Sequence, residues 1–294
     1  MVSASNITFI RHLRRFVATI MTATVLLSGT AVILESPARA MSQELRAEFL
    51  TGFAGLARDQ RQLKAIAGLF GLPPEREALL MDYLVDIYSD ADFAERMVDE
   101  IARSGLFEDV TDFRDQPDAM RMGFSLGYEI ASALAISGMA KMDNDDIQQF
   151  FVLMTQAFGR IAPHHCRAMI QEASTSQQSM MAAGIAVMQE LDLDDLRTYL
   201  GLSRLAIRLE LSGRLPRLAP NGDQMDLANR AFEKAFQKEI EASPRPERVL
   251  LALLNENGAR DEDFCDAGTV LFKAMAGMDG LPGQWMRLAA LQAG

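Results

Sequence analysis

Apolar side chains recur at three- and four-residue intervals through most of the chain, and prolines and glycines interrupt this pattern. Such spacing places the apolar residues on one face of a helix. No long run alternates apolar and polar residues as a strand does, and the strong helix formers Ala, Leu, Met, Glu, Gln and Arg dominate. The pattern therefore predicts an all-α protein, a multi-helix bundle of about ten helices.

The interruptions set the expected limits of individual helices. A first helix is expected at residues 42–70, where the Gly-Leu-Pro-Pro sequence at 71–74 ends it. A second begins at Pro74 or Glu75, a third covers about 92–103, and residues 109–116 are expected to form a loop. Toward the C-terminus, helices are expected at 223–242, 244–256 and 261–278, with a short final piece from Leu281.

The stretch at residues 122–140 is apolar or small on every side, apart from Glu129 and scattered serines. A helix of this kind is usually buried at the centre of a domain. Its small residues recur every four positions and predict a ridge that lets another helix approach closely: Gly123, Gly127, Ala131 and Ala135. The alternative is a membrane-spanning helix, but a central glutamate makes spanning costly. A soluble core helix is the preferred interpretation.

Residues 139–153 resemble residues 188–202, 49 positions further on. Asp143 and Asp192 take the capping position of a helix in the two copies, and acidic residues follow in the first turn. Two explanations stay open: a duplicated helix-turn-helix unit, or the general similarity of good helix starts. Two copies are too few to indicate a solenoid.

Residues 41–294 are expected to form a single all-helical domain. Within it, residues 212–222 have the most linker-like composition, with Pro216, Pro220 and two glycines. This segment is a possible sub-boundary before a C-terminal helical layer, or a long surface loop.

The first forty residues have the pattern of a secretory signal peptide. Arg11, Arg14 and Arg15 precede an apolar stretch at 16–34, and small residues lead to an expected cleavage between Ala40 and Met41. The mature protein is then expected to be periplasmic or secreted. The alternative is an uncleaved segment at 16–34 that anchors the protein in the inner membrane, facing the periplasm.

The chain carries a net charge of −11, and residues 1–40 hold four arginines but one acid, so their removal makes it more negative. This charge repels nucleic acid and anionic lipid surfaces. Nucleic acid is therefore excluded as an expected partner, and membrane contact is expected only through residues 16–34 if they stay uncleaved.

Two cysteines, Cys166 and Cys265, lie 99 positions apart. Each shares a helical face with apolar residues, so both thiols are expected to point into the core. In an oxidising compartment an even cysteine count favours pairing. The sequence therefore predicts a disulfide between them.

Few residues are candidates for chemistry. His164 and His165 are the only histidines after residue 40, and neighbouring positions at a helix start point about 100° apart, so they rarely share a metal ion. No phosphate loop or nucleophile motif occurs, and no cofactor is predicted. Glu129 is the one catalytic candidate, because burial in an apolar helix raises a carboxyl pKa and favours a proton donor.

These features favour an exported, non-enzymatic protein that binds another protein, as an adaptor, chaperone or inhibitor. An acidic surface suits a basic partner. Two alternatives stay open: a carrier that holds a lipid-like small molecule in a helical cavity, and a hydrolase that uses carboxylates alone.

Overall fold

The computed structural model describes residues 42–104, 117–171, 177–254 and 258–292. Within these ranges all regular structure is helical, as the sequence predicts, and thirteen helices are formed. They are α2 (Gln43–Leu56), α3 (Gln60–Gly68), α4 (Pro74–Tyr88), α5 (Ala91–Ser104), α6 (Pro117–Met139), α7 (Asn144–Phe158), α8 (Pro163–Ile170), α9 (Gln177–Glu190), α10 (Leu193–Leu211), α11 (Gly222–Ala242), α12 (Pro246–Leu253), α13 (Asp261–Ala276) and α14 (Gly280–Gln292).

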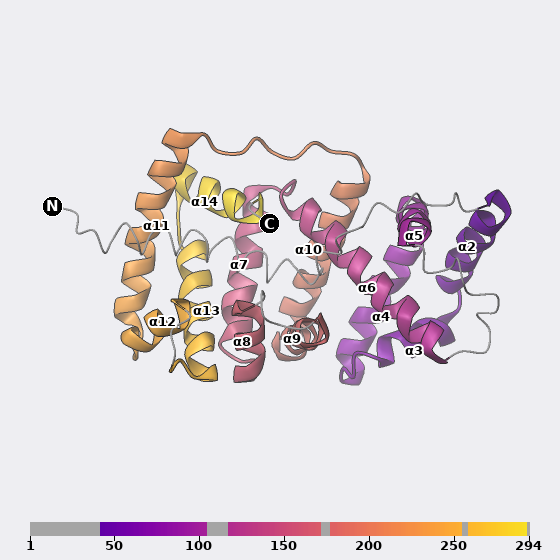
Figure 1. The fold of residues 1–294 in the computed structure, drawn as a ribbon, viewed down its shortest axis with the longest axis horizontal. Helices are drawn as coiled ribbons and strands as arrows, with labels where there is room; N and C mark the ends of the chain where they lie inside the picture. Colours follow the sequence, from indigo (N-terminus) through magenta and orange to yellow (C-terminus); the bar gives the residue numbers. More distant parts are fainter. Residues whose placement is uncertain (1–41, 105–116, 172–176, 255–257, 293–294) are drawn as a thin grey trace.

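The helices form an elongated bundle (Figure 1). Helices α2 to α5 make up one end and α11 to α14 the other, and α6, α7, α9 and α10 lie between them. Most buried apolar side chains form one large cluster that runs from Leu63 in α3 to Leu291 in α14, and a smaller second cluster lies around Phe93 of α5. Phe272 of α13 is fully buried, and its ring centroid lies 5.9 Å from that of Phe151 and 5.1 Å from that of Phe158, both in α7. A continuous aromatic and aliphatic core therefore spans both ends.

Helix α6 is not enclosed on every side, contrary to the expectation from its composition. Ala133 and Ser137 are exposed, while Leu134 and Gly138 are buried. Exposing a small apolar side chain to water costs little free energy, so the apolar composition of α6 did not require burial on every face. Helix α13 is instead deeply buried, with nine buried residues packed among α7, α8, α11 and α12.

The closest approach to α6 lies at a glycine outside the predicted ridge. A Cβ atom added to Gly138 would overlap the backbone carbonyl of Ala206 in α10. The two helices therefore touch backbone to backbone at this point. At Gly127, by contrast, an added Cβ would meet only Met97 Cε at 3.6 Å and the Tyr88 hydroxyl at 3.7 Å. The prediction of a close helix neighbour along the ridge is wrong there.

Three predicted helix limits were also wrong. Residues 42–70 form two helices, because Asp59 caps α3 by accepting hydrogen bonds from the Arg61 and Gln62 backbone N–H groups. Helix α12 begins at Pro246 rather than Pro244, since a residue before proline is driven out of the helical region and Arg245 has φ −138°. The final piece is a full helix, α14.

The two similar segments begin helices at equivalent positions. Asp143 and Asp192 occupy the N-cap sites of α7 and α10 in extended conformation, but neither side chain makes the predicted capping hydrogen bond. Asp192 instead pairs with Arg160 at 3.0 Å. The two segments thus share the position of the helix start but not a capping hydrogen bond.

Residues 212–221 form a non-helical strap that crosses the molecule from α10 to α11, along the top edge of the view in Figure 1. Arg217 anchors it by donating to Asn144 Oδ1 at 2.6 Å, and Gln292 donates to the Arg217 carbonyl at 2.7 Å. Leu215 and Leu218 are 83% and 93% exposed. The strap is thus held through the side chain and the carbonyl of Arg217, while two leucines are exposed to solvent.

Among the described helices, none combines the length and apolarity that crossing a bilayer requires. The predicted signal or anchor at 1–40, its cleavage site and the predicted loop at 109–116 lie outside the described residues.

Candidate functional site

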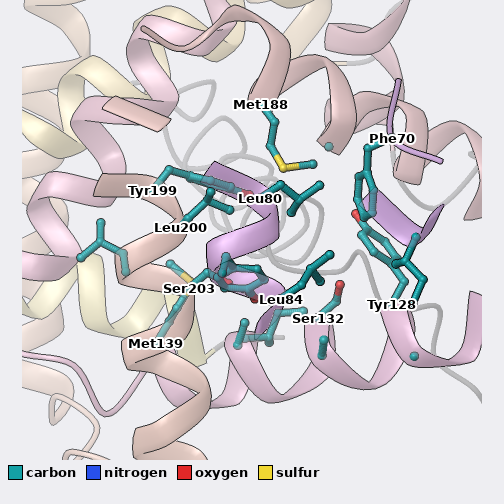
Figure 2. A pocket seen from close by; sticks show the side chains of 18 of the residues that line it. Phe70, Leu80, Leu84, Tyr128, Ser132, Met139, Met188, Tyr199, Leu200 and Ser203 are labelled. Carbon is teal, nitrogen blue, oxygen red and sulfur yellow. Dashed lines mark hydrogen bonds between the residues drawn. The ribbon is translucent and has the colours of Figure 1, made fainter. Parts of the chain in front are cut away.

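A cavity of about 140 Å³ lies where α3, α4, α6, α9 and α10 meet, with Phe150 of α7 closing one side. Figure 2 shows its side chains converging from these helices. The lining consists of Ile66, Phe70, Leu80, Tyr83, Leu84, Tyr88, Gly127, Tyr128, Ala131, Ser132, Ala135, Ile136, Met139, Phe150, Gly184, Met188, Tyr199, Leu200, Leu202 and Ser203.

The small residues of α6 explain why a hollow exists at this place. Gly127, Ala131 and Ala135 lie one turn apart and all line the cavity, and Gly184 does so from α9. At these positions the side chains are too short to fill the space between the helices. Three residues of the predicted ridge thus face a hollow, while the side-chain surroundings of the fourth, Gly123, lie outside the described part.

All four tyrosines of the chain line this one cavity. Tyr83 and Tyr88 come from α4, Tyr128 from α6 and Tyr199 from α10. Their phenol groups join a hydrophobic ring to a hydroxyl that can donate or accept a hydrogen bond. Residues up to 116 positions apart are therefore brought together, and this convergence is the most distinctive feature of the described structure.

Other aromatic rings hold the tyrosine rings in place. Tyr88 stacks on Phe53 of α2 with centroids 6.2 Å apart, and meets Phe93 of α5 edge-on at 5.8 Å. The ring centroids of Phe70 and Tyr128 lie 6.4 Å apart, and Figure 2 shows the two side chains next to each other. Contacts of this kind favour fixed ring orientations, so the cavity has defined walls.

One tyrosine shares a hydrogen bond with a serine in the lining. The Tyr83 hydroxyl lies 3.1 Å from Ser203 Oγ of α10. Ser132, one turn after Tyr128 in α6, also lines the cavity. Each hydroxyl carries one hydrogen and two lone pairs. A tyrosine–serine pair that shares one hydrogen therefore keeps a second one, which a bound molecule can accept.

The tyrosines are held in their neutral form. Burial raises the pKa of Tyr88 and of Tyr199 to about 12, and the neighbouring Tyr83 adds to both shifts. Burial also raises the pKa of Tyr83, against the opposing effects of Ser203 and Arg204, and that of Tyr128. The phenols are therefore donors as well as acceptors at physiological pH, and none is a ready base.

Charged groups fix the cavity walls from outside the lining. Asp86 of α4 accepts hydrogen bonds from Arg204 at 3.1 Å and Arg208 at 3.0 Å, which ties α4 to α10. Arg76 of α4 donates to the Met188 carbonyl at 3.0 Å and to the Leu191 carbonyl, at the end of α9. A cation at a helix C-terminus is favourable. Among the described residues that line the cavity, none has a charged side chain.

The two cysteines meet elsewhere in the molecule. Cys166 of α8 and Cys265 of α13 lie at disulfide distance, with their Cα atoms 5.0 Å apart, within the usual range for a disulfide. The periodicity argument that both thiols face the core was correct for Cys166, which is fully buried, and Cys265 is partly buried. The pair links α8 to the buried helix α13.

The other candidate residues do not join this site. His164 and His165 lie at the start of α8 with ring centroids 3.9 Å apart, and burial and His164 together lower the pKa of His165. Within the described residues, no three His, Cys, Asp or Glu side chains are grouped to hold a metal ion. Glu129 lies in α6, but its side chain is outside the described part.

Sequence reasoning missed the cavity because each tyrosine by itself looks like an ordinary partly buried helix residue. The available signal was their number: a chain of this length holds only four, spread over three predicted helices. Comparisons with known proteins add no further assignment, because no protein-family model matches the chain and neither the curated proteins nor the solved structures give a significant match.

Proposed function

We propose that this chain is an exported, non-enzymatic binding protein that holds a small apolar molecule in the tyrosine-lined cavity. The observation that carries the proposal is the hollow itself, because protein interiors are close-packed and a void of this size forfeits contacts. Ligand sites in helical proteins lie between helices and combine an apolar lining with a few polar groups. The described lining has this composition.

The volume favours a smaller ligand than the lipid-like molecule expected from the sequence. Drug-sized ligands occupy pockets of roughly 300–1,000 Å³, whereas this cavity measures about 140 Å³. Its described lining holds neither a carboxylate nor a histidine, and this chemistry suits binding better than acid–base catalysis. The cysteine pair at disulfide distance supports export, since disulfides persist in oxidising compartments.

Thermal unfolding with toluene tests this proposal. A ligand that binds only the folded state stabilises it by about 2.7 kcal/mol at a hundred times its Kd, which raises the Tm by roughly 5–10 °C. Ala131→Leu fills the hollow from α6 and is expected to abolish this rise. Ala133→Leu is the matched control, because Ala133 is exposed on the same helix and does not line the cavity. Equal toluene responses in both variants would refute cavity binding.

A specific observation also favours the protein-binding role expected from the sequence. Leu215 and Leu218 stand almost fully exposed on the strap at 212–221, with Pro216 between them. Proline-containing extended segments are recognised by apolar grooves of partner proteins. Photo-cross-linking from position 218 in the intact cell is expected to give one discrete adduct, which Leu215→Ser weakens without lowering the Tm. A diffuse set of cross-linked products whose yield is the same with Leu215→Ser would count against this role.

A further inference from the structure

We infer that the ligand is a neutral molecule of about one aromatic ring that carries a hydroxyl or carbonyl group. This inference rests on the proposed function, because it specifies what the tyrosine-lined cavity accepts. Three properties of the described lining lead to it: its volume, its lack of charge and its hydroxyl groups, which include the Tyr83–Ser203 pair.

The volume sets the size of the ligand. A cavity of ~150 Å³ lined by aliphatic and aromatic side chains takes up benzene, and this one measures about 140 Å³. The walls are aromatic on several sides, with Phe70, Tyr128 and Tyr199 among them. Aromatic rings pack well against one another edge-to-face or offset. A single ring therefore matches both the space and the surface offered to it.

The lack of charge sets the ionic state of the ligand. The described lining contains no arginine, lysine or histidine that could pair with an anion, and no carboxylate for a cation. An isolated ion in an apolar site loses its hydration without compensation. The neighbouring Arg204 and Arg208 are already engaged by Asp86. A carboxylate or an ammonium group on the ring is therefore expected to prevent binding.

The hydroxyl groups set the polar group of the ligand. Tyr83 and Ser203 place a hydrogen-bonded pair in a largely apolar wall, and Tyr128 and Ser132 add hydroxyls to the same lining. Figure 2 shows Ser203 and Ser132 at the lower side of the hollow. If the ligand were purely apolar, these hydroxyls would lose hydrogen bonds to water and gain none in exchange. A ligand hydroxyl or carbonyl restores one, which makes binding roughly three- to tenfold tighter than for the unsubstituted ring.

Calorimetric titration of the folded chain with phenol, toluene and benzoate tests the inference, because the three probes share one ring and differ in polarity and charge. Phenol is expected to bind roughly three- to tenfold tighter than toluene, and benzoate to show no binding. Combined Tyr83→Phe and Ser203→Ala substitutions remove both hydroxyls of the hydrogen-bonded pair and are expected to remove the preference for phenol while toluene affinity stays the same. The unchanged toluene affinity shows that the variant is folded. Ser137→Ala, at an exposed serine of α6, is the matched control and should keep the preference.

The possible outcomes separate the inference from the proposed function. Toluene binding as tight as phenol, a preference for phenol that survives removal of the Tyr83 and Ser203 hydroxyls, or binding of benzoate would each overturn the inference and leave the cavity as an apolar site. Absence of binding by all three probes would overturn the proposed function, and the inference with it.

Discussion

Gly138→Ala is expected to destabilise the fold by about 3 kcal/mol or more. The added Cβ would overlap the Ala206 carbonyl, and a backbone group cannot rotate aside as a long side chain can. Relief therefore requires α6 and α10 to separate along their extensive contact in the middle of the molecule. Overpacking of a rigid interior costs about 1–3 kcal/mol and sometimes more. The loss at Gly138 is expected at the upper end of this range. Urea unfolding of the purified variant measures the loss.

The same substitution in the same helix provides the control. At Gly127 an added Cβ makes only ordinary contacts, with Met97 Cε and the Tyr88 hydroxyl. Alanine is favoured over glycine inside a helix by about 0.5–1 kcal/mol, so Gly127→Ala should leave stability unchanged or raise it slightly. Equal effects at the two positions would show that the close approach of α6 and α10 is not as described.

Removal of the cysteine pair is expected to lower stability by about 2–5 kcal/mol. A cross-link that closes a loop of about 100 residues restricts the unfolded chain, and the chain-entropy model gives about 4.7 kcal/mol as its contribution. Alanine is the suitable replacement, because Cys166 is fully buried and a serine hydroxyl there would lack hydration. The double variant Cys166→Ala with Cys265→Ala should show the loss in urea unfolding.

Reductant supplies the internal control for this second prediction. It should destabilise the original chain by the same amount and leave the double variant unchanged. Two titratable thiols in the chain purified from the oxidising compartment, or insensitivity to reductant, would contradict a disulfide and weaken the argument for export.

Helical periodicity indicated which residues of a helix face the core, although it missed the break between α2 and α3. Helix α4 begins at Pro74, since proline at a first helical position loses no hydrogen bond. In the two similar segments, Ile147 and Leu196 take equivalent positions and both are buried. Cys166 and Cys265 likewise face a common interior. These features depend on the order of residues along one helix, which the sequence contains.

The cavity depends on how the helices are placed relative to one another, which periodicity along the chain does not specify. Spacing indicates that Ala131 and Tyr199 face inward, but not whether another side chain fills the space in front of them. That depends on how α4, α6, α9 and α10 are placed, which Arg76, Asp86 and Gly138 fix through contacts between distant segments. The small residues of α6 were therefore interpreted as a surface for another helix, although three of them border a hollow.

The binding proposal joins two features that the sequence offered separately. The cysteine pair supports a protein that works outside the cytosol, and the cavity supports a role that needs no catalytic group. A carrier of small neutral molecules satisfies both. The outward leucines of the strap at 212–221 would then be a second surface, through which a loaded protein could meet a partner.

The most direct measurement is a toluene titration of the chain with isotope-labelled aromatic rings, followed by nuclear magnetic resonance. All four tyrosines line the cavity, whereas the single tryptophan, Trp285 of α14, does not. We predict that the ring resonances of Tyr83, Tyr88, Tyr128 and Tyr199 shift together and saturate with one affinity, while those of Trp285 stay in place. Tyrosine resonances that do not move, or that move no more than Trp285, would contradict the proposed binding site.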